Sequence, residues 1–377
     1  MSEGDVAVVG GGIAGLLLAY NLRSEATVFE AGTFGSRGRR CPGIISADTL
    51  ERLPGALKYA QQFYDSLSFI IPELSLRAEV YSKRPFACKI NRAWHEEWLS
   101  SELENRGVKL VSRTRVDNVK PVEKSVKVSW SKGERFYRAV VLAEGYPPVL
   151  SKKLGLAQPA DARIGLFTSA HLRGECETNR LQVVYSPRML KGFSWLAPLD
   201  ERRAVVGVVT EVGSDAFETL TNSKKMFTKV GVDMELVGEP RGGYVLRGYT
   251  RTLGRGRVFA FGDAANMVKS LSGGGLYGIS VAAKPVALMV DAVASGDAPS
   301  REVTREVRKI LIRLYKGFLL AKRFDSALQT IPPLGVKLDS KVHRLEYDLH
   351  EVSLAQILTG VRKLTLKFPQ SRIQERN

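Results

Sequence analysis

The chain has 377 residues, of which 44% are hydrophobic, and these values are typical of a globular protein with one large domain or two interleaved ones. The three cysteines, Cys41, Cys88 and Cys176, are scattered and odd in number, which excludes a disulfide framework, argues against a metal site and favours a reducing cytoplasm. The formal net charge of +17 comes without a nucleic-acid-binding module, so we expect no nucleic-acid partner and explain the charge by an anionic lipid surface or by solubility alone.

The first thirty residues have the clearest organisation. A strand over residues 5–9, a glycine-rich turn, a helix over 13–23 and a second strand over 26–29 follow one another. No signal peptide precedes the first strand, and no clean run of about 20 apolar residues occurs later. We therefore expect a cytoplasmic protein.

The turn has the pattern G-x-G-x-x-G, formed by Gly10, Gly12 and Gly15. The first glycine permits the tight bend, the second lets the backbone approach a pyrophosphate, and the third lets the helix pack on the strand. Glu30 ends the second strand, where its carboxylate can bind both hydroxyls of an adenosine ribose. The pattern alone also occurs in turns without a ligand, but the flanking elements and the acid favour an ADP-containing dinucleotide.

The next part of the chain returns to the nucleotide site several times. Residues 31–46 are rich in glycine and arginine and should form a loop across the site. We expect a helix over 47–67, an extended segment over 74–81, and a helix that Asn91 caps and Gly107 stops. Strands follow over 108–111, 116–130 and 136–143, and the last runs into Glu144 and Gly145.

The pattern then changes to short alternating strands over residues 163–210, which predicts a separate antiparallel sheet. A helix over 215–230 and a strand over 242–249 complete it. The chain then returns to the nucleotide domain with a buried strand over 258–261, which ends at Gly262 and Asp263, and a long helix that begins at 273–275. From residue 301 onward the chain is helical and basic.

These segments predict an α/β protein with three parts. The dinucleotide domain comprises residues 1–155 and 250–298, and within it 47–85 could lean on the second domain. The antiparallel-sheet substrate domain comprises 156–249. A helical, basic C-terminal region comprises 299–377.

Three motifs together point to a family. They are the N-terminal turn with Glu30, the Glu144-Gly145 pair after an apolar strand, and Gly262-Asp263 before a glycine-rich helix start. Their order and spacing are similar to those of the glutathione-reductase-type FAD fold, in the branch shared by p-hydroxybenzoate-hydroxylase-like monooxygenases and geranylgeranyl reductases. The resemblance spans about residues 5–295 and implies a Rossmann-like domain that binds FAD. It departs at Glu144, where the family usually has Asp.

The resemblance also implies roles for individual residues. Asp263 would accept a hydrogen bond from a ribityl hydroxyl, and the helix after it would direct its positive end at the flavin ring. Arg92 and Arg39 or Arg40 would reach the pyrophosphate or the ribityl chain. The cofactor-binding residues are then Gly10, Gly12, Ile13, Ala14, Gly15, Glu30, Ala31, Arg40, Arg92, Val116, Glu144, Gly145, Gly262, Asp263, Gly274, Gly275 and Leu276.

Two further segments resemble geranylgeranyl reductases in particular. Residues 193–198, with Gly207 beyond them, are similar to a signature that lines the isoprenoid tunnel of the archaeal enzymes, although Ala197 and Val209 depart from it. Residues 40–43 resemble the cysteine-glycine loop that approaches the flavin. The resemblance implies Cys41 as the catalytic residue and a substrate-binding set of Gly43, Phe193, Trp195 and Pro198. Trp195 as an ordinary core aromatic and Cys41 as an inert buried thiol are the alternatives.

Three functions are compatible with these residues. The first is an FAD-dependent reductase that saturates double bonds of an isoprenoid lipid, with NAD(P)H or a small redox protein as external electron donor. The second is an aromatic monooxygenase, and the third is a membrane-associated electron-transfer flavoprotein. Trp195 and Cys41 favour the first.

The start of the C-terminal region bears on the large positive charge. Residues 301–323 contain eight basic residues and two Glu, interleaved with apolar residues at helical spacing. The basic residues are Arg301, Arg305, Arg308, Lys309, Arg313, Lys316, Lys322 and Arg323. One interpretation is a core-packed helix with a solvated outer face. The other is a basic amphipathic surface that docks the protein peripherally on the inner face of an anionic membrane.

Overall fold

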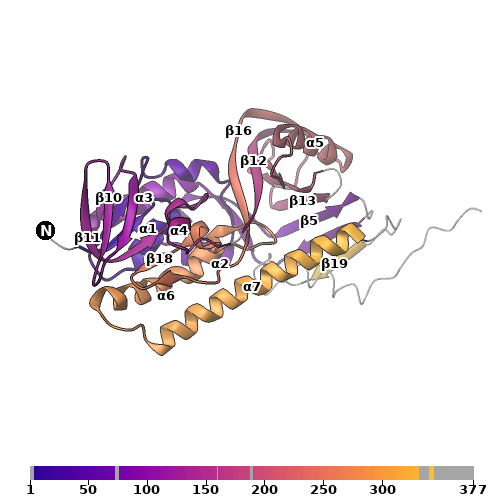
Figure 1. Ribbon diagram of the computed structural model, residues 1–377. Coiled ribbons are helices and arrows are strands. Elements are labelled where there is room, and N and C mark those ends of the chain that lie inside the picture. Colours follow the sequence, from indigo (N-terminus) through magenta and orange to yellow (C-terminus); the bar gives the residue numbers. More distant parts are fainter. Residues whose placement is uncertain (1–3, 73–75, 159, 187–189, 331–338, 344–377) are drawn as a thin grey trace, which may run out of the picture. The chain divides into compact units, whose positions relative to one another are not determined.

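The computed structural model describes residues 4–72, 76–158, 160–186, 190–330 and 339–343 (Figure 1). The chain forms two compact units, and each is assembled from three separate segments. The first unit comprises Met1–Gln61, Cys88–Arg163 and Arg241–Ala321, and the second comprises Gln62–Ala87, Ile164–Pro240 and Lys322–Asn377. The sequence-based division differs in two places. Gln62–Ala87 joins the second unit, and the predicted separate C-terminal region is divided at Ala321 between the first unit and the second.

The first unit contains a sheet with a parallel centre. Across it the strands are β17 (Gly254–Arg255), β18 (Val258–Ala260), β11 (Gly133–Leu142), β1 (Gly4–Val9), β2 (Ala26–Phe29) and β8 (Lys109–Val111). The strands β18, β11, β1, β2 and β8 pair in parallel, and β9 (Val116–Pro121) and β10 (Val126–Trp130) extend β11 as an antiparallel hairpin. Val6, Ala7 and Val8 are fully buried, which is typical of a parallel strand covered on both faces.

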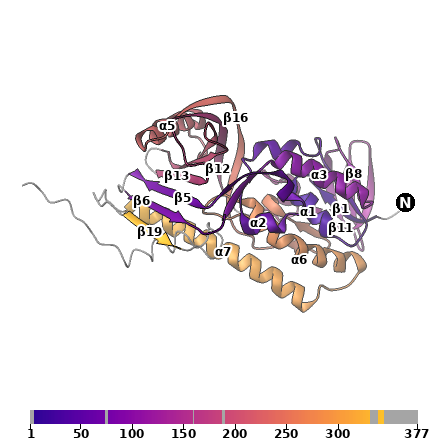
Figure 2. The ribbon, with the colours of Figure 1, turned by 180° about the vertical axis from the view of Figure 1, so that it is seen from behind.

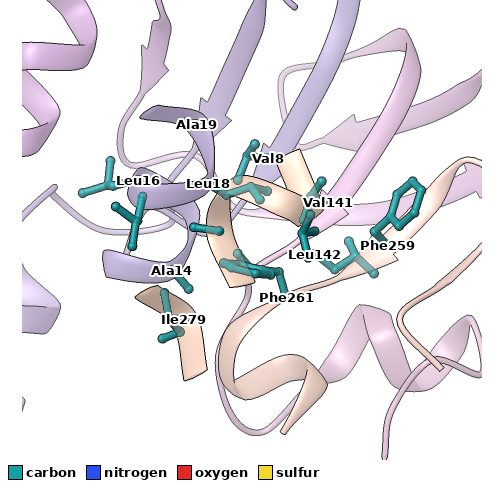
Figure 3. Packing of buried hydrophobic residues seen from close by; sticks show 14 of the residues in the cluster. Val8, Ala14, Leu16, Leu18, Ala19, Val141, Leu142, Phe259, Phe261 and Ile279 are labelled. Atoms are coloured by element: carbon teal, nitrogen blue, oxygen red, sulfur yellow. The ribbon is translucent and has the colours of Figure 1, made fainter. Parts of the chain in front are cut away.

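Helices cover this sheet. They are α1 (Ile13–Asn21), α2 (Ala47–Arg52), α3 (Arg92–Asn105), α4 (Val149–Lys153), α6 (Gly275–Ser295) and α7 (Arg301–Thr330), with 3-10 turns at η1 (Ser36–Arg40), η2 (Ala56–Tyr59) and η4 (Gly262–Ala265). The helices α1 and α6 pack against each other (Figure 2). Their apolar side chains meet Val8, Val141 and Leu142 of the central strands in one continuous core (Figure 3).

Among the described residues, the second unit contains a sheet of eight strands, a helix that packs on it, and the end of α7 from Lys322 onward. Across the sheet the strands are β16 (Asp233–Gly248), β12 (Ala160–Arg173), β15 (Arg203–Glu211), β14 (Gly192–Pro198), β13 (Arg180–Ser186), β5 (Ser66–Ile71), β6 (Leu76–Tyr81) and β19 (Asp339–His343). The helix α5 (Ala216–Lys229) packs on one face through Met226 and Phe227, which join Leu196 and Val206 of the sheet in a second core. A three-stranded sheet has the order β3 (Ile44–Ser46), β7 (Ala87–Ile90) and β4 (Ala60–Tyr64).

The α/β fold class is confirmed, and three of its details are corrected. The predicted helix over 47–67 ends at Arg52, because Pro54 and Gly55 follow, and the chain then enters β4 and β5. The second sheet is mixed and not purely antiparallel, since β5 pairs in parallel with β13 and β19 with β6. The predicted helical C-terminal region contains the strand β19, while residues 331–338 and 344–377 lie outside the described part of the chain.

Candidate functional site

Four parallel strands of the first unit end beside one another. The strands β2, β1, β11 and β18 are neighbours in this order and run in one direction. They are followed by Glu30, Gly10, Glu144 and Gly262, respectively. Open parallel sheets bind ligands outside the carboxyl ends of their strands. The sheet therefore brings motifs that lie up to 250 residues apart in sequence to one edge.

The glycine turn after β1 is tightly built. Gly10 has φ +113°, and a Cβ atom there would lie 2.2 Å from the carbonyl oxygen of Ala143. A Cβ atom on Gly15 would lie 1.9 Å from the carbonyl oxygen of Gly10. Gly12, in contrast, has an ordinary φ of −76°, and a Cβ atom there would meet nothing within 4 Å. The open space in front of Gly12 lies at the amino end of α1, where no side chain caps the helix.

Glu30 holds this turn in place. Its side chain is buried, and its Oε2 accepts a hydrogen bond from the Gly11 amide at 2.8 Å while Oε1 accepts one from the Gly32 amide at 2.7 Å. Each carboxylate oxygen has a further lone pair. Glu30 therefore orients the glycine turn and retains the capacity to accept ribose hydroxyls, which stays its predicted role.

The third motif lies against the first. Gly262 has φ +69°, and a Cβ atom there would lie 2.6 Å from the Cβ of Ala14 in α1. The next residue, Asp263, has its Oδ1 beside Gly275, 3.1 Å from the position of a Cβ atom there. Gly275 opens α6, and no side chain caps this helix. A half-buried carboxylate and the open amino end of a helix thus share one position.

Arg92, at the start of α3, joins this group. Its side chain is 8% exposed and forms an ion pair with Glu96, whose side chain is completely buried. Burial alone would lower the pKa of Arg92, but the Glu96 carboxylate more than offsets this and raises it. Burial raises the pKa of Asp263, and the nearby Arg92 charge partly opposes that shift. Arg92 thus lies close enough to interact with Asp263.

Cys41 lies in the same cluster. The Cys41 sulfur lies near enough to the Arg92 guanidinium to contribute to the raised pKa of Arg92. Burial lowers the pKa of Lys89, and the nearby Cys41 sulfur opposes that shift. Cys41 is half-buried and packs against the first core, whereas Cys88 is fully buried and burial raises its pKa to about 12. The role of Cys41 as the catalytic residue stays a prediction.

Gly43 brings the cysteine loop close to Arg92. It has φ +73°, and a Cβ atom there would lie 2.3 Å from the carbonyl oxygen of Ile90 and 3.3 Å from Cγ of Arg92. The Ile90 amide donates a hydrogen bond to the Gly43 carbonyl at 2.8 Å. Only a glycine lets the loop after Cys41 run this close to the strand that leads into α3.

Glu144 stabilises the helix that follows it in the sequence. Its carboxylate accepts hydrogen bonds from the amides of Val149, Leu150 and Ser151 at 2.6–3.0 Å and so caps α4. Its backbone nitrogen lies next to the glycine turn, 3.0 Å from the position of a Cβ atom on Gly10. Cofactor binding by Glu144 stays a prediction, and its side chain already serves the helix.

The remaining predicted residues differ in their burial. Ile13, Ala14, Leu276 and Val116 are buried in the first core. Ala31 and Arg40 are exposed, and Arg40 directly precedes Cys41 at the end of η1. Gly145 has φ +77° and Gly274 is the residue before α6.

Of the predicted substrate residues, Gly43 lies in the first unit, whereas Phe193, Trp195 and Pro198 lie in the second unit, on β14. Leu196 packs toward α5, so Phe193 and Trp195, at odd spacing from it, belong to the opposite face of the sheet. The Trp195 ring lies over Gly207 of β15, where a Cβ atom would be 2.3 Å from the ring. Gly207 thus makes room for the indole. Phe193 and Trp195 are half-buried and Pro198 is buried.

Sequence reasoning missed Glu96. It is fully buried, and its Oε2 has no hydrogen-bond partner among the described residues. Burial raises its pKa, and the ion pair with Arg92 opposes that shift. A signal was present in the sequence, because an acid four residues after an arginine in a helix lies on the same face.

These residues fit an ADP-containing flavin. The space before Gly12 and the two uncapped helix ends offer free backbone amides, which suit a pyrophosphate and a ring that gains negative charge. Glu30, Arg92 and Asp263 add an acceptor, a cation and a second acceptor at the same sheet edge. Among the described residues no group of three His, Cys, Asp or Glu side chains could hold a metal ion.

One described helix, α6, is long and apolar enough to span a membrane by length and composition. Of its most apolar window, 56% is buried inside the protein. It packs against α1 and the central sheet, so it is a core helix of the first unit.

Comparison with known proteins places this fold. No family model matches the chain. A geranylgeranyl bacteriochlorophyll reductase-like protein from Thermoplasma acidophilum has a similar structure, with a TM-score of 0.76, 16% identity and 98% of each chain covered. The flavin-dependent halogenase CmlS is similar with a TM-score of 0.64 and 21% identity, covering 84% of this chain and 62% of that one. The halogenase PltM, solved in complex with FAD, has a TM-score of 0.67 and 14% identity.

The sequence relatives match only part of the chain. Protein FixC of Salmonella typhi is 27% identical over 172 residues, which are 42% of this chain and 40% of FixC. The chain therefore matches less than half the length of this relative. Digeranylgeranylglycerophospholipid reductase of Methanococcus vannielii is 20% identical over 290 residues, which are 72% of this chain and 73% of that protein.

The chain thus has the fold of FAD-dependent oxidoreductases, and the similarity to geranylgeranyl reductase-like proteins inferred from the motifs is confirmed at the level of the fold. The same neighbours support FAD as the cofactor.

Proposed function

We propose that this chain is an FAD-dependent reductase that saturates carbon–carbon double bonds of an isoprenoid lipid. The observation that carries the proposal is the position of the Cys41 loop beside Arg92, because a Cβ atom on Gly43 would lie 3.3 Å from Cγ of this buried side chain. A thiol in this loop can donate a proton. The fold match over 98% of both chains to a geranylgeranyl reductase-like protein is consistent with it.

The reduction requires a hydride on one alkene carbon and a proton on the other. FAD, once bound and reduced by NAD(P)H or a small redox protein, would supply the hydride. Glu30, Arg92 and Asp263 would bind and orient the cofactor, and the open amino end of α6 would favour negative charge next to it.

Cys41 would supply the proton. Its S–H bond would break as the new C–H bond forms, and the nearby cations Arg92 and Lys89 would stabilise the resulting thiolate. A proton from water then restores the thiol. Glu96 keeps the buried Arg92 charge paired and so positions it beside the sulfur.

The substrate side of the proposal rests on the second unit. Trp195 stands over Gly207 on the sheet face opposite α5, in register with Val183 of β13. This row of apolar side chains suits an isoprenoid chain, which offers no hydrogen-bonding groups.

The test uses the full-length protein loaded with FAD and reduced by dithionite under anaerobic conditions. With a geranylgeranyl lipid as substrate, we expect reoxidation of the flavin together with products heavier by two hydrogens per reduced bond, measured by mass spectrometry. Cys41→Ser should retain its FAD content and lose turnover by about 100-fold, the typical contribution of a general acid. Cys176→Ser, a half-buried cysteine of the second unit, is the matched control and should retain the wild-type rate.

The alternatives give different results. Reoxidation only by oxygen, with hydroxylation of an aromatic compound, would indicate a monooxygenase, a class also represented among similar structures by p-nitrophenol 4-monooxygenase PnpA. Reoxidation only by a redox protein, without a lipid product, would indicate electron transfer. A fully active Cys41→Ala variant would assign the proton to water or to another residue.

A further inference from the structure

The apolar stripe of α7 is used by the protein itself. Val307, Leu314 and Ala321 recur every seven residues and are at most 5% exposed, so this stripe packs on the first unit. Phe318 lies against the ring of Tyr249, with ring centroids 5.1 Å apart. These apolar residues of α7 are therefore not available to a membrane.

A different face of α7 is free of the core. Arg305, Arg308, Ile312, Lys316 and Leu319 follow one another at spacings of three and four residues, which aligns them in one row along the helix. All five are exposed, and the two apolar side chains, Ile312 and Leu319, are 44% and 37% exposed. The row contains no acid.

Other side chains of α7 contact residues of the first unit. Arg313 donates a hydrogen bond to the Tyr277 hydroxyl of α6 at 3.1 Å. Tyr315 lies against Tyr249, with ring centroids 4.8 Å apart. The helix thus separates residues that attach it to the first unit from a row that faces solvent.

We propose that this row, Arg305, Arg308, Ile312, Lys316 and Leu319, docks the protein on an anionic phospholipid bilayer. Three cations without an acid complement lipid phosphates, and the two apolar side chains between them would leave water by entering the interface. Cations alone would serve a nucleic acid equally well, but the exposed Ile312 and Leu319 would gain nothing on a phosphate backbone. The bilayer therefore explains both kinds of side chain.

This surface rests on the proposed function, because an isoprenoid substrate resides in membranes and docking would deliver the protein to it. The binding test is independent of turnover. Vesicle binding without lipid reduction would refute the proposed reductase activity and support the docking surface. Reduction of detergent-dispersed substrate without vesicle binding would refute the docking surface and support the reductase activity.

The experiment measures cosedimentation of the FAD-loaded full chain with vesicles. We expect binding to vesicles of phosphatidylcholine and phosphatidylglycerol in equal amounts, loss of that binding at high salt, and little binding to phosphatidylcholine alone. The variant Arg305→Glu, Arg308→Glu and Lys316→Glu should weaken binding by about 100-fold or more. The variant Ile312→Ser and Leu319→Ser should weaken it measurably while its salt dependence stays the same.

The matched control reverses three exposed lysines of the β9–β10–β11 segment, Lys120→Glu, Lys124→Glu and Lys132→Glu, and so changes the net charge equally. It should bind vesicles like the wild type, and all variants should retain their FAD. An equal loss of vesicle binding in the control would mean that net charge alone explains the effect, and it would overturn the proposal. So would equal binding to neutral and anionic vesicles, no binding to either, or tight binding to duplex DNA in place of vesicles.

Discussion

Three glycines of the first turn are required for three different reasons. Gly10 has a positive φ and faces the backbone of Ala143, and Gly15 faces the backbone of Gly10 itself. Gly12 has a backbone conformation open to any residue and faces nothing. The fold alone therefore requires the first and third glycines, whereas the need for the second arises only when a ligand approaches.

A pair of single substitutions separates these requirements. Gly12→Ala should leave the free energy of unfolding of the FAD-free protein within about 1 kcal/mol of the wild type, since alanine is only modestly worse than glycine before a helix. The same variant should bind FAD at least tenfold more weakly, because its methyl group occupies the space before α1. Gly10→Ala should lower the free energy of unfolding by about 3 kcal/mol even without FAD.

Urea unfolding of the FAD-free variants and flavin fluorescence titration provide the two measurements. Unaltered FAD affinity in a folded Gly12→Ala variant would mean that no ligand approaches this turn.

At the scale of an element, α3 concentrates buried polar groups near its amino end. His95 is fully buried, and its Nε2 is 2.9 Å from the carbonyl oxygen of Pro54. Burial lowers the pKa of His95, the contact with Pro54 opposes this shift, and the charge of Arg92 adds to it. The imidazole is therefore held neutral one turn away from the cysteine cluster.

This burial predicts a pH dependence of stability. Because the folded-state pKa of His95 is below its unfolded value of about 6.5, the unfolded chain takes up the proton first, and stability falls as the pH falls below that value. The free energy of unfolding of the wild type should therefore fall more steeply from neutral pH to pH ~5.5 than that of His95→Gln, by up to about 1.4 kcal/mol per pH unit. The melting temperature, which is the quantity measured, should drop more steeply in the same way. Glu96 and Asp263 titrate in both proteins, so the comparison isolates His95. Parallel pH profiles would contradict the prediction.

At the scale of the whole molecule, the candidate site is assembled from all three segments of the first unit. Glu30 and Cys41 come from the first segment, Arg92 from the second, and Asp263 from the third. A ligand that contacts all of them links segments that are distant in the sequence. Binding should therefore stabilise the unit as a whole and not a single loop.

Removal of the cofactor tests this linkage. The FAD-free protein should melt at a lower temperature than the holoprotein, and FAD at about 100 times its Kd should restore about 2.7 kcal/mol of stability. FMN lacks the ADP half and should restore much less, because Glu30 and the turn at Gly12 would have no ligand. Differential scanning fluorimetry provides the measurement, and equal stabilisation by FMN would show that the turn does not bind the ADP part.

Elements whose signals are local could be predicted from the sequence. The strand, glycine turn and helix at the amino terminus lie where the pattern placed them, because each depends on neighbours within a few residues. The same holds for the cap of α3, where Asn91 Oδ1 accepts a hydrogen bond from the Trp94 amide at 3.2 Å. The order and spacing of the motifs were enough to recognise a resemblance to an FAD fold, and the parallel strands gather the residues that follow them at one edge.

Features that depend on residues distant in the sequence could be read only from the three-dimensional structure. Periodicity shows that a segment such as β5 is apolar but not that it pairs in parallel with β13, because the partner is more than 100 residues away. Periodicity also shows that α7 is amphipathic, yet only the packing shows that Val307 and Leu314 face the core while Ile312 and Leu319 face water. The ion pair of Glu96 with Arg92, and the place of Cys41 beside it, depend equally on burial. Burial is set by how the whole chain closes around a side chain, and no local pattern contains it.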